Sequence, residues 1–142
     1  MIALASDHGG FELKQAVIEH LKERGLEYRD FGTYDKSSCD YPGFARAAAQ
    51  AVASGECDRG IVVCTTGIGV SIVANKVPGI RCALCTDATL ARMTRLHNDA
   101  NVLALGGGIV GNLVAMDIVD TFLDTPFSEE EKHKRRIASI EG

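Results

Sequence analysis

A chain of 142 residues, with 46% hydrophobic residues, 24% charged residues and a formal net charge of −4, has the composition of an ordinary globular protein. That length predicts one domain, residues 1–142, which can bury a core without disulfide bonds. No long basic run offsets the negative charge, so we expect no nucleic-acid partner. No apolar run approaches the roughly 20 residues of a membrane-spanning helix, so we expect no membrane partner.

Cysteine usage points to a reducing compartment. The chain has an odd number of cysteines without the spacing of a zinc site, at positions 39, 57, 64, 82 and 85. This cysteine usage is typical of a protein whose thiols stay reduced. The N-terminus enters a strand pattern directly and lacks the charged region of a secretory signal peptide. We therefore expect a cytoplasmic protein.

Short apolar runs alternate with helical patterns along the chain. The runs predict strands at residues 1–6, 27–31, 60–63, 80–85 and 102–105. The helical spacings predict a helix that ends at Gly25, one over 44–53, one that follows Gly69, and others over 88–96, 112–123 and 129–140. Residues 32–42 are rich in turn formers and predict a loop.

Repeated alternation of strand and helix is typical of a parallel sheet covered on both faces. We predict an α/β fold with three αβα layers: a Rossmann-like, doubly wound sheet of five parallel strands in the order 2-1-3-4-5. That order places the ends of the first and third strands, Asp7-His8 and Cys64, side by side, where such sheets bind ligands. The charged last helix is expected to pack only partly on its own domain and to extend to a neighbouring subunit.

The stretch Arg59–Lys76 carries the strongest functional signal. A buried strand ends at Cys64, turns through Thr66-Gly67-Ile68-Gly69 and leads into a helix. Unpaired amides at such a turn can hold an anion, and a thiol beside them can act as a base or nucleophile. The alternative is that Cys64 is a small buried hydrophobe. The loop is no Walker A motif, because Val70 stands where that motif has lysine.

Asp7-His8-Gly9-Gly10 follows the first strand and allows two interpretations. Asp7 can simply cap the first helix while the glycines form the turn. Alternatively, Asp7 and His8 supply a carboxylate and an imidazole for proton transfer or anion contact. The paired glycines do not form a GxGxxG fingerprint, so a dinucleotide site is not indicated.

Two further pairs of residues are candidates for the site, because they carry positive charge or a ring that titrates near neutral pH. His97 and Asn98 close the fourth long helix, where His97 can act as a general acid. They can equally form a helix end with Asn98 in the left-handed conformation. Lys132 and Arg136 share one face of the last helix at an i,i+4 spacing and can reach a phosphate together. A solvated basic face is the alternative.

Two other patterns carry little functional signal. Cys82 and Cys85 form a CxxC string, but it lies in a predicted strand, where residues i and i+3 point to opposite faces. Neither a redox pair nor a metal clip is therefore favoured. His20 lies among charged residues of the first helix and is expected to be solvated.

Several motifs in order resemble the RpiB/LacAB family of sugar-phosphate isomerases over essentially the whole chain. They are DHGG at 7–10, DYP at 40–42, CTTGIG at 64–69, ANK at 74–76, PGIR at 78–81 and HNDANVLALG at 97–106. The resemblance implies interconversion of aldose and ketose phosphates through a cis-enediolate, with no metal or organic cofactor. Ribose 5-phosphate and ribulose 5-phosphate are the leading pair.

The resemblance also implies roles for particular residues. Cys64 is the base that moves a proton between C1 and C2, and Thr66 assists at the hydroxyl groups or in ring opening. The amides of Thr65, Thr66, Gly67, Ile68 and Gly69 hold the enediolate oxygen, a role suited to fixed donors. Asp7 and His97 open the furanose ring. The remaining substrate contacts are Asn98 to sugar oxygens, Tyr41 along the site, and His8, Lys132 and Arg136 to the phosphate.

Members of this family are dimers, often paired into tetramers. The resemblance therefore implies a homodimer or homotetramer whose active site takes His97, Asn98 and part of the phosphate clamp from the neighbouring subunit.

The chain departs from the family pattern at particular positions. Thr65 replaces a glycine, and a β-branched residue resists positive φ, so the loop is altered or gains a hydroxyl near the sugar. Gly108 stands where many members carry a phosphate-binding arginine, and Lys132 replaces an arginine and its bidentate fork.

Other segments leave the substrate open. Residues 31–35 and 106–111 look more like the galactose-6-phosphate isomerase branch, so a six-carbon substrate such as allose or galactose 6-phosphate is the alternative. A remote alternative is a non-catalytic flavodoxin-like binding module, although only 6% of the chain is aromatic.

Overall fold

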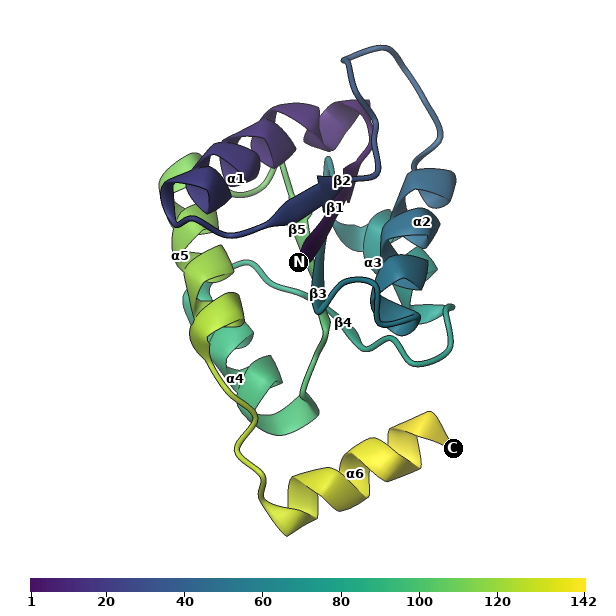
Figure 1. Cartoon of the computed structure of the whole chain (residues 1–142), viewed down its shortest axis with the longest axis vertical. Helices are drawn as coiled ribbons and strands as arrows, with labels where there is room; N and C mark the ends of the chain where they lie inside the picture. The colour runs from purple at the N-terminus through teal and green to yellow at the C-terminus, as the bar shows by residue number, and fades with distance from the viewer.

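Five parallel strands form the centre of the computed structural model, which describes residues 1–142 (Figure 1). The strands are β1 (Ile2–Ser6), β2 (Tyr28–Asp30), β3 (Arg59–Cys64), β4 (Cys82–Leu84) and β5 (Val102–Gly106). The helices are α1 (Phe11–Glu23), α2 (Tyr41–Ala53), α3 (Ile68–Asn75), α4 (Ala88–Asn98), α5 (Asn112–Asp124) and α6 (Glu131–Glu141). The predicted α/β class with one all-parallel sheet is confirmed.

The predicted order of the last two strands is wrong. The sheet runs β2-β1-β3-β5-β4, so β5 lies beside β3 and β4 forms the edge. The reason is burial: all five residues of β5 are buried, which suits an inner strand, whereas β4 has three half-buried residues. The side chain of Asn75 satisfies both the amide and the carbonyl of Cys82 on that edge.

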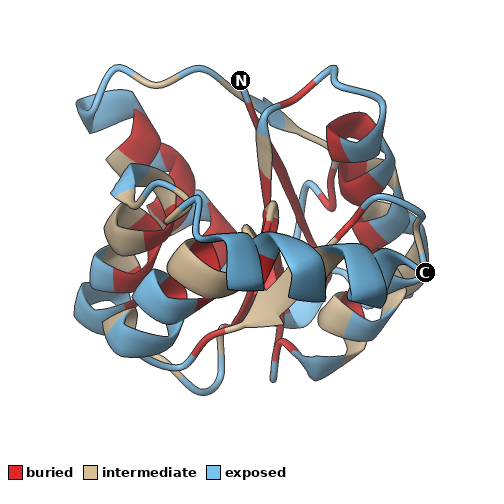
Figure 2. Cartoon of the chain, turned by 90° about the horizontal axis from the view of Figure 1, so that it is seen from below, coloured by how far each residue is buried: buried red, intermediate tan, exposed pale blue.

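Two apolar cores separate the sheet from its helices. On one face, side chains of α1, α4 and α5 pack against alternate strand residues such as Leu4, Ile61 and Leu103. On the other face, α2 and α3 pack against Ala3, Val62 and their neighbours. Figure 2 shows buried residues on the sheet-facing sides of these helices and exposed residues outside. The alternation follows from the period of two in a strand.

Helix α2 begins earlier than predicted. It starts at Tyr41 with Asp40 as its N-cap residue, whereas the sequence pattern assigned residues up to Pro42 to a loop. Proline is well tolerated in the first helical turn, because the N–H that it lacks would have no intrahelical partner there. The earlier start attaches Tyr41 to a rigid element.

Two weak sequence patterns are resolved by packing. Cys82 packs on the side of α2 and α3, and Cys85 on the side of α1 and α5, so the two thiols face opposite ways as predicted. Burial raises the pKa of Cys85 to about 12. The expectation that His20 is solvated is wrong: its Nε2 lies 2.7 Å from Oδ1 of Asp120 and joins α1 to α5.

Helix α6 is the outlying element. It follows α5 after a short extended segment and lies below the body of the molecule in Figure 1. His133 is the one buried residue of this helix. The helix starts two residues later than predicted, and its partial packing on its own domain matches the expectation.

Candidate active site

Cys64 ends β3 and is buried, with 6% of its surface exposed. The chain then turns through Gly67, whose φ of +80° is left-handed, and enters α3. The amide of Gly67 donates a hydrogen bond to Sγ of Cys64 over 3.2 Å. This contact orients the thiol toward the first turn of α3.

The turns that follow β1 and β3 touch each other. The amide of Asp7 donates to the carbonyl of Val63 over 3.3 Å. A Cβ placed on Gly10 would lie 2.5 Å from the carbonyl oxygen of Val63, a backbone atom, so this close approach requires glycine. The sequence predicted this juxtaposition of Asp7-His8 with Cys64, and the structure brings them together.

Asp7 is buried and acts as a capping residue, which is the simpler of its two interpretations. Its Oδ1 accepts the amide hydrogen of Gly10 over 3.0 Å and so caps the short 3₁₀ turn His8–Gly10. No protein hydrogen bond is made by its second carboxylate oxygen. The cap fixes the carboxylate at the end of β1 and leaves that oxygen available to a ligand.

His8 is exposed and its ring is oriented by the loop before α2. The amide of Cys39 donates to Nδ1 of His8 over 3.2 Å. Because Nδ1 accepts, the proton of the neutral ring lies on Nε2. His8 can therefore donate from Nε2 to an anion.

The loop between β3 and α3 presents polar groups on its outer side. Thr65 and Thr66 are exposed, and Oγ1 of Thr66 accepts the amide hydrogen of Ile68 over 3.2 Å. The ring of Tyr41 lies against Gly69, since a Cβ there would meet the ring at 2.6 Å. The ring of Tyr41 thus lies over the first turn of α3, beside the loop that Cys64 begins.

The structure does not bring the remaining predicted residues to this place. His97 and Asn98 end α4 just before β5 starts, whereas Cys64 pairs in register with Gly106 at the far end of β5. A strand of this length spans roughly 13 Å. Within one chain, Cys64 therefore lies at the carboxyl ends of the strands, and His97 and Asn98 lie at their amino ends.

His97 and Asn98 belong to a second cluster that includes α6. The ring of His97 stacks on that of His133 with centroids 4.2 Å apart. Lys132 and Arg136 on the same helix are exposed and make no hydrogen bond or ion pair within the chain. Their charges are therefore free to meet an anion.

The left-handed helix end expected at Asn98 lies one residue later. Asn98 is the last helical residue, and Asp99 adopts a φ of +45°. Asn98 keeps its side chain exposed, with Oδ1 accepting from the hydroxyl of Thr94 over 3.0 Å.

His133 was missed by the sequence reasoning. The i,i+4 rule selects Lys132 and Arg136, and His133 lies on the neighbouring face that turns toward α4. Burial and the neighbouring ring of His97 lower the pKa of His133. Its position between two charged residues in the basic run was the only signal in the sequence.

A cavity of about 720 Å³ belongs to this second cluster. It lies between β4, α4 and the end of α6, and its walls include His97, Asn98 and Ile140. Cys64 does not line it. The candidate thiol base and this cavity are therefore separate within one chain.

The molecule offers neither a metal-binding cluster of side chains nor a membrane-spanning helix. Histidine, cysteine, aspartate and glutamate side chains nowhere gather in a group of three or more that could hold a metal ion. None of the helices has the length and apolarity needed to cross a membrane.

Comparison with known proteins identifies the family. The family model described as Ribose/Galactose Isomerase matches residues 2–140. The chain belongs to this isomerase family. Ribose-5-phosphate isomerase B of Escherichia coli strain K12 is 46% identical over 139 residues, which cover 98% of this chain and 93% of that protein.

Solved structures agree with this assignment. Ribose-5-phosphate isomerase B of Clostridium thermocellum is 55% identical, covers 99% of this chain and 94% of its own, and superposes with a TM-score of 0.97. The Mycoplasma genitalium enzyme with bound ribulose 5-phosphate is 40% identical over 99% of this chain and 93% of its own, with a TM-score of 0.93.

One expected departure from the family pattern is without structural cost. The non-glycine residues with positive φ are Asp99 and Glu129, so Thr65 adopts an ordinary conformation in the isomerase loop. Gly108 supplies no side chain, and its amide donates to the carbonyl of Thr65 over 2.8 Å. It ties the turn after β5 to the loop after β3.

Proposed function

We propose that this chain is a ribose-5-phosphate isomerase, which interconverts ribose 5-phosphate and ribulose 5-phosphate. The observation that carries the proposal is a thiol at the end of β3, held by the amide of Gly67 in a Gly-rich turn that leads into α3, in a chain of the isomerase family. The relatives reported above are named ribose-5-phosphate isomerase B. The six-carbon substrates and the flavodoxin-like module have less support.

Cys64 is the proposed base. Its thiolate takes the C2 proton of the open-chain aldose, and the electron pair forms the C1–C2 double bond while O1 becomes an enediolate oxygen. The thiol then returns the proton to C1, and the proton on O2 passes to O1 as the C2 carbonyl forms. The amides of Thr65–Gly69 oppose the charge on the enediolate. Thr66 assists the transfer between the oxygens.

The other proposed roles follow the two clusters. At the carboxyl ends of the strands, beside Cys64, Asp7 shares in ring opening, His8 binds the phosphate and Tyr41 lines the site. From the second cluster, His97 opens the furanose ring and Asn98 contacts sugar oxygens. Lys132 and Arg136 complete the phosphate contact.

The separation of the clusters supports an assembly. Since Cys64 and His97 lie at opposite ends of the parallel strands, a complete site requires two copies of the chain. We propose a homodimer or homotetramer with shared sites, in which α6 reaches the neighbouring subunit and residues 1–142 act as one sugar-phosphate isomerase domain. A cytoplasmic location fits five unpaired cysteines.

A substrate panel tests this function. We expect the wild-type protein to convert ribose 5-phosphate with a kcat/KM at least about tenfold above that for allose 6-phosphate or galactose 6-phosphate. A site discriminates strongly against a sugar that leaves the polar groups of the site unpaired. A preference for either six-carbon sugar would replace the substrate and keep the chemistry. Absence of turnover on all three would refute the proposed function.

A further inference from the structure

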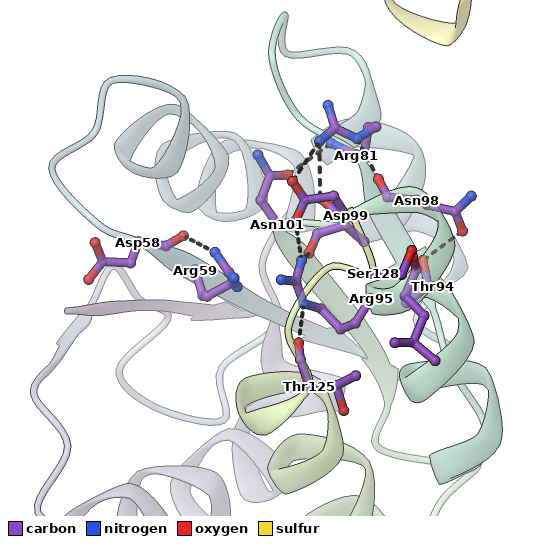
Figure 3. Close-up of polar contacts among 12 residues, drawn as sticks. Asp58, Arg59, Arg81, Thr94, Arg95, Asn98, Asp99, Asn101, Thr125 and Ser128 are labelled. Atoms are coloured by element: carbon purple, nitrogen blue, oxygen red, sulfur yellow. Dashed lines mark hydrogen bonds and ion pairs between the residues drawn. The ribbon is translucent and has the colours of Figure 1, made fainter. Parts of the chain in front are cut away.

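The corner that follows α4 is held by arginines. The last carbonyls of a helix have no partner within it, and here Arg81, from the segment before β4, supplies partners. Its Nε donates to the carbonyl of Asn98 over 2.7 Å, and its Nη2 donates to that of Asp99 over 3.0 Å (Figure 3). The backbone immediately after His97 is therefore fixed by one side chain.

Asp99 gives this corner its shape. It is a non-glycine residue in the left-handed region, with a φ of +45°. Its carboxylate lies 2.7 Å from Nη1 of Arg95 and 3.8 Å from Nη2 of Arg81. Arg95 is almost fully buried and also donates to the carbonyls of Ala100 and Thr125 (Figure 3). Two guanidinium groups thus hold the strained turn that ends in β5.

Arg81 is itself held in place. Its backbone amide donates to Oδ1 of Asn101 over 2.9 Å, and its carbonyl accepts the amide hydrogen of Asn101 over 3.0 Å. The Arg81 side chain is 19% exposed. Its guanidinium therefore starts from a fixed backbone and makes its contacts at little further entropic cost.

The same guanidinium reaches α6. Nη1 of Arg81 lies 2.8 Å from Oε1 of Glu141, the last residue of that helix. Near the start of α6, the hydroxyl of Ser128 donates to the carbonyl of Leu96 over 2.7 Å. Between these two points lies the stack of His97 on His133. Because α6 is otherwise exposed, these contacts determine where it lies.

We propose that Arg81 is a positioning residue that joins the His97–Asn98 corner to α6, so that both are presented to the neighbouring subunit as one rigid unit. This inference rests on the proposed function. Arg81 touches no reacting atom; it acts on ring opening through His97 and on phosphate binding through α6. Lysine cannot replace it fully, because a single ammonium group lacks the planar fork that reaches Asn98, Asp99 and Glu141 together.

A double-mutant cycle tests the inference. We expect Arg81→Gln to lower kcat on ribose 5-phosphate about tenfold, since a small misplacement of a catalytic group is costly. The kcat of Arg81→Lys should lie between those of the wild type and Arg81→Gln. In a His97→Gln background, where we expect the remaining turnover to depend on spontaneous ring opening, Arg81→Gln should change kcat less than about twofold. Arg46→Gln is the control, because Arg46 is exposed on α2 and makes no ion pair.

Glu141→Gln gives an independent readout. It removes the ion pair to Arg81 at the end of α6, so KM for the sugar phosphate should rise about threefold with kcat unchanged. This variant tests the positioning role of Arg81 even if Arg81→Gln does not fold. An unchanged KM would then overturn the inference.

The other outcomes are also decisive. Wild-type kcat in Arg81→Gln, or an equal loss in both backgrounds, would overturn the positioning role while leaving the proposed function intact. Absence of isomerase activity in the wild type would refute the proposed function, and this inference with it.

Discussion

Substituting Gly67 tests whether the loop after β3 packs as tightly against β5 as the structure shows. Gly67 has a φ of +80°, and a Cβ there would lie 2.5 Å from Cδ1 of Leu84 and 2.8 Å from the carbonyl carbon of Leu105. The leucine tip can move, but the backbone of β5 cannot move freely. Gly55 is a matched control, because its φ of +86° is similar and nothing lies within 4 Å of its Cβ position.

The two alanine variants separate conformational strain from collision. Alanine in the left-handed region costs about 1–2 kcal/mol at either position. At Gly67 the collision adds about 1–3 kcal/mol, as overpacking does in other cores. We therefore expect Gly67→Ala to lose about 1–3 kcal/mol more free energy of unfolding than Gly55→Ala, or roughly 3–10 °C more in Tm.

Urea denaturation and thermal unfolding of both variants measure this difference, and isomerase assays add a second readout. A shift of Gly67 moves its amide away from Sγ of Cys64, so kcat should fall in Gly67→Ala and stay at the wild-type level in Gly55→Ala. Equal stability losses in the two variants would refute the tight contact between the loop and β5.

Three other predictions follow from the structure. Mixed refolding of Cys64→Ala with His97→Gln should restore activity toward about a quarter of wild type, because half of the random dimers carry one complete site; no gain over either parent would contradict shared sites. Lys14 is fully buried and its Nζ lies 2.7 Å from Asp30, so Asp30→Asn should cost about 2–4 kcal/mol in urea denaturation and more than Lys14→Met, because it leaves a buried charge unpaired. Burial raises the pKa of Cys85 to about 12; the unfolded thiol ionises from about pH 8.5, so the free energy of unfolding should fall as pH rises from there toward 12, and less steeply in Cys85→Ala. An identical slope in the two proteins would show that Cys85 does not contribute.

Local patterns predicted much of the fold. Alternating runs and helical spacings located all five strands, and the resemblance to known motifs identified the family. The order of β4 and β5 was wrong, because the sequence pattern was read for element type and not for how many faces of each strand are buried. The complete burial of Val102–Gly106 indicates an inner strand once it is compared with the half-buried Cys82–Leu84.

One part of the candidate site could be predicted from the sequence, and another part could not. The pairing of Asp7-His8 with Cys64 follows from β1 lying beside β3, which the predicted order already contained. The roles of Arg81 and Arg95 could not be predicted, because they depend on long-range contacts with backbone carbonyls. A sequence pattern marks a charged side chain but does not show which carbonyls it meets.

The most direct measurement for the proposed mechanism compares Cys64→Ala, Cys64→Ser and wild type in isomerisation of ribose 5-phosphate, with thermal unfolding to show that each is folded. Cys82→Ala, which removes a thiol on the edge strand, is the control. We predict that both Cys64 variants lose at least about 10³-fold in kcat, a loss within the range expected for a general base, and that Cys82→Ala retains activity. Turnover near the wild-type rate in folded Cys64→Ala would contradict the thiol as the base.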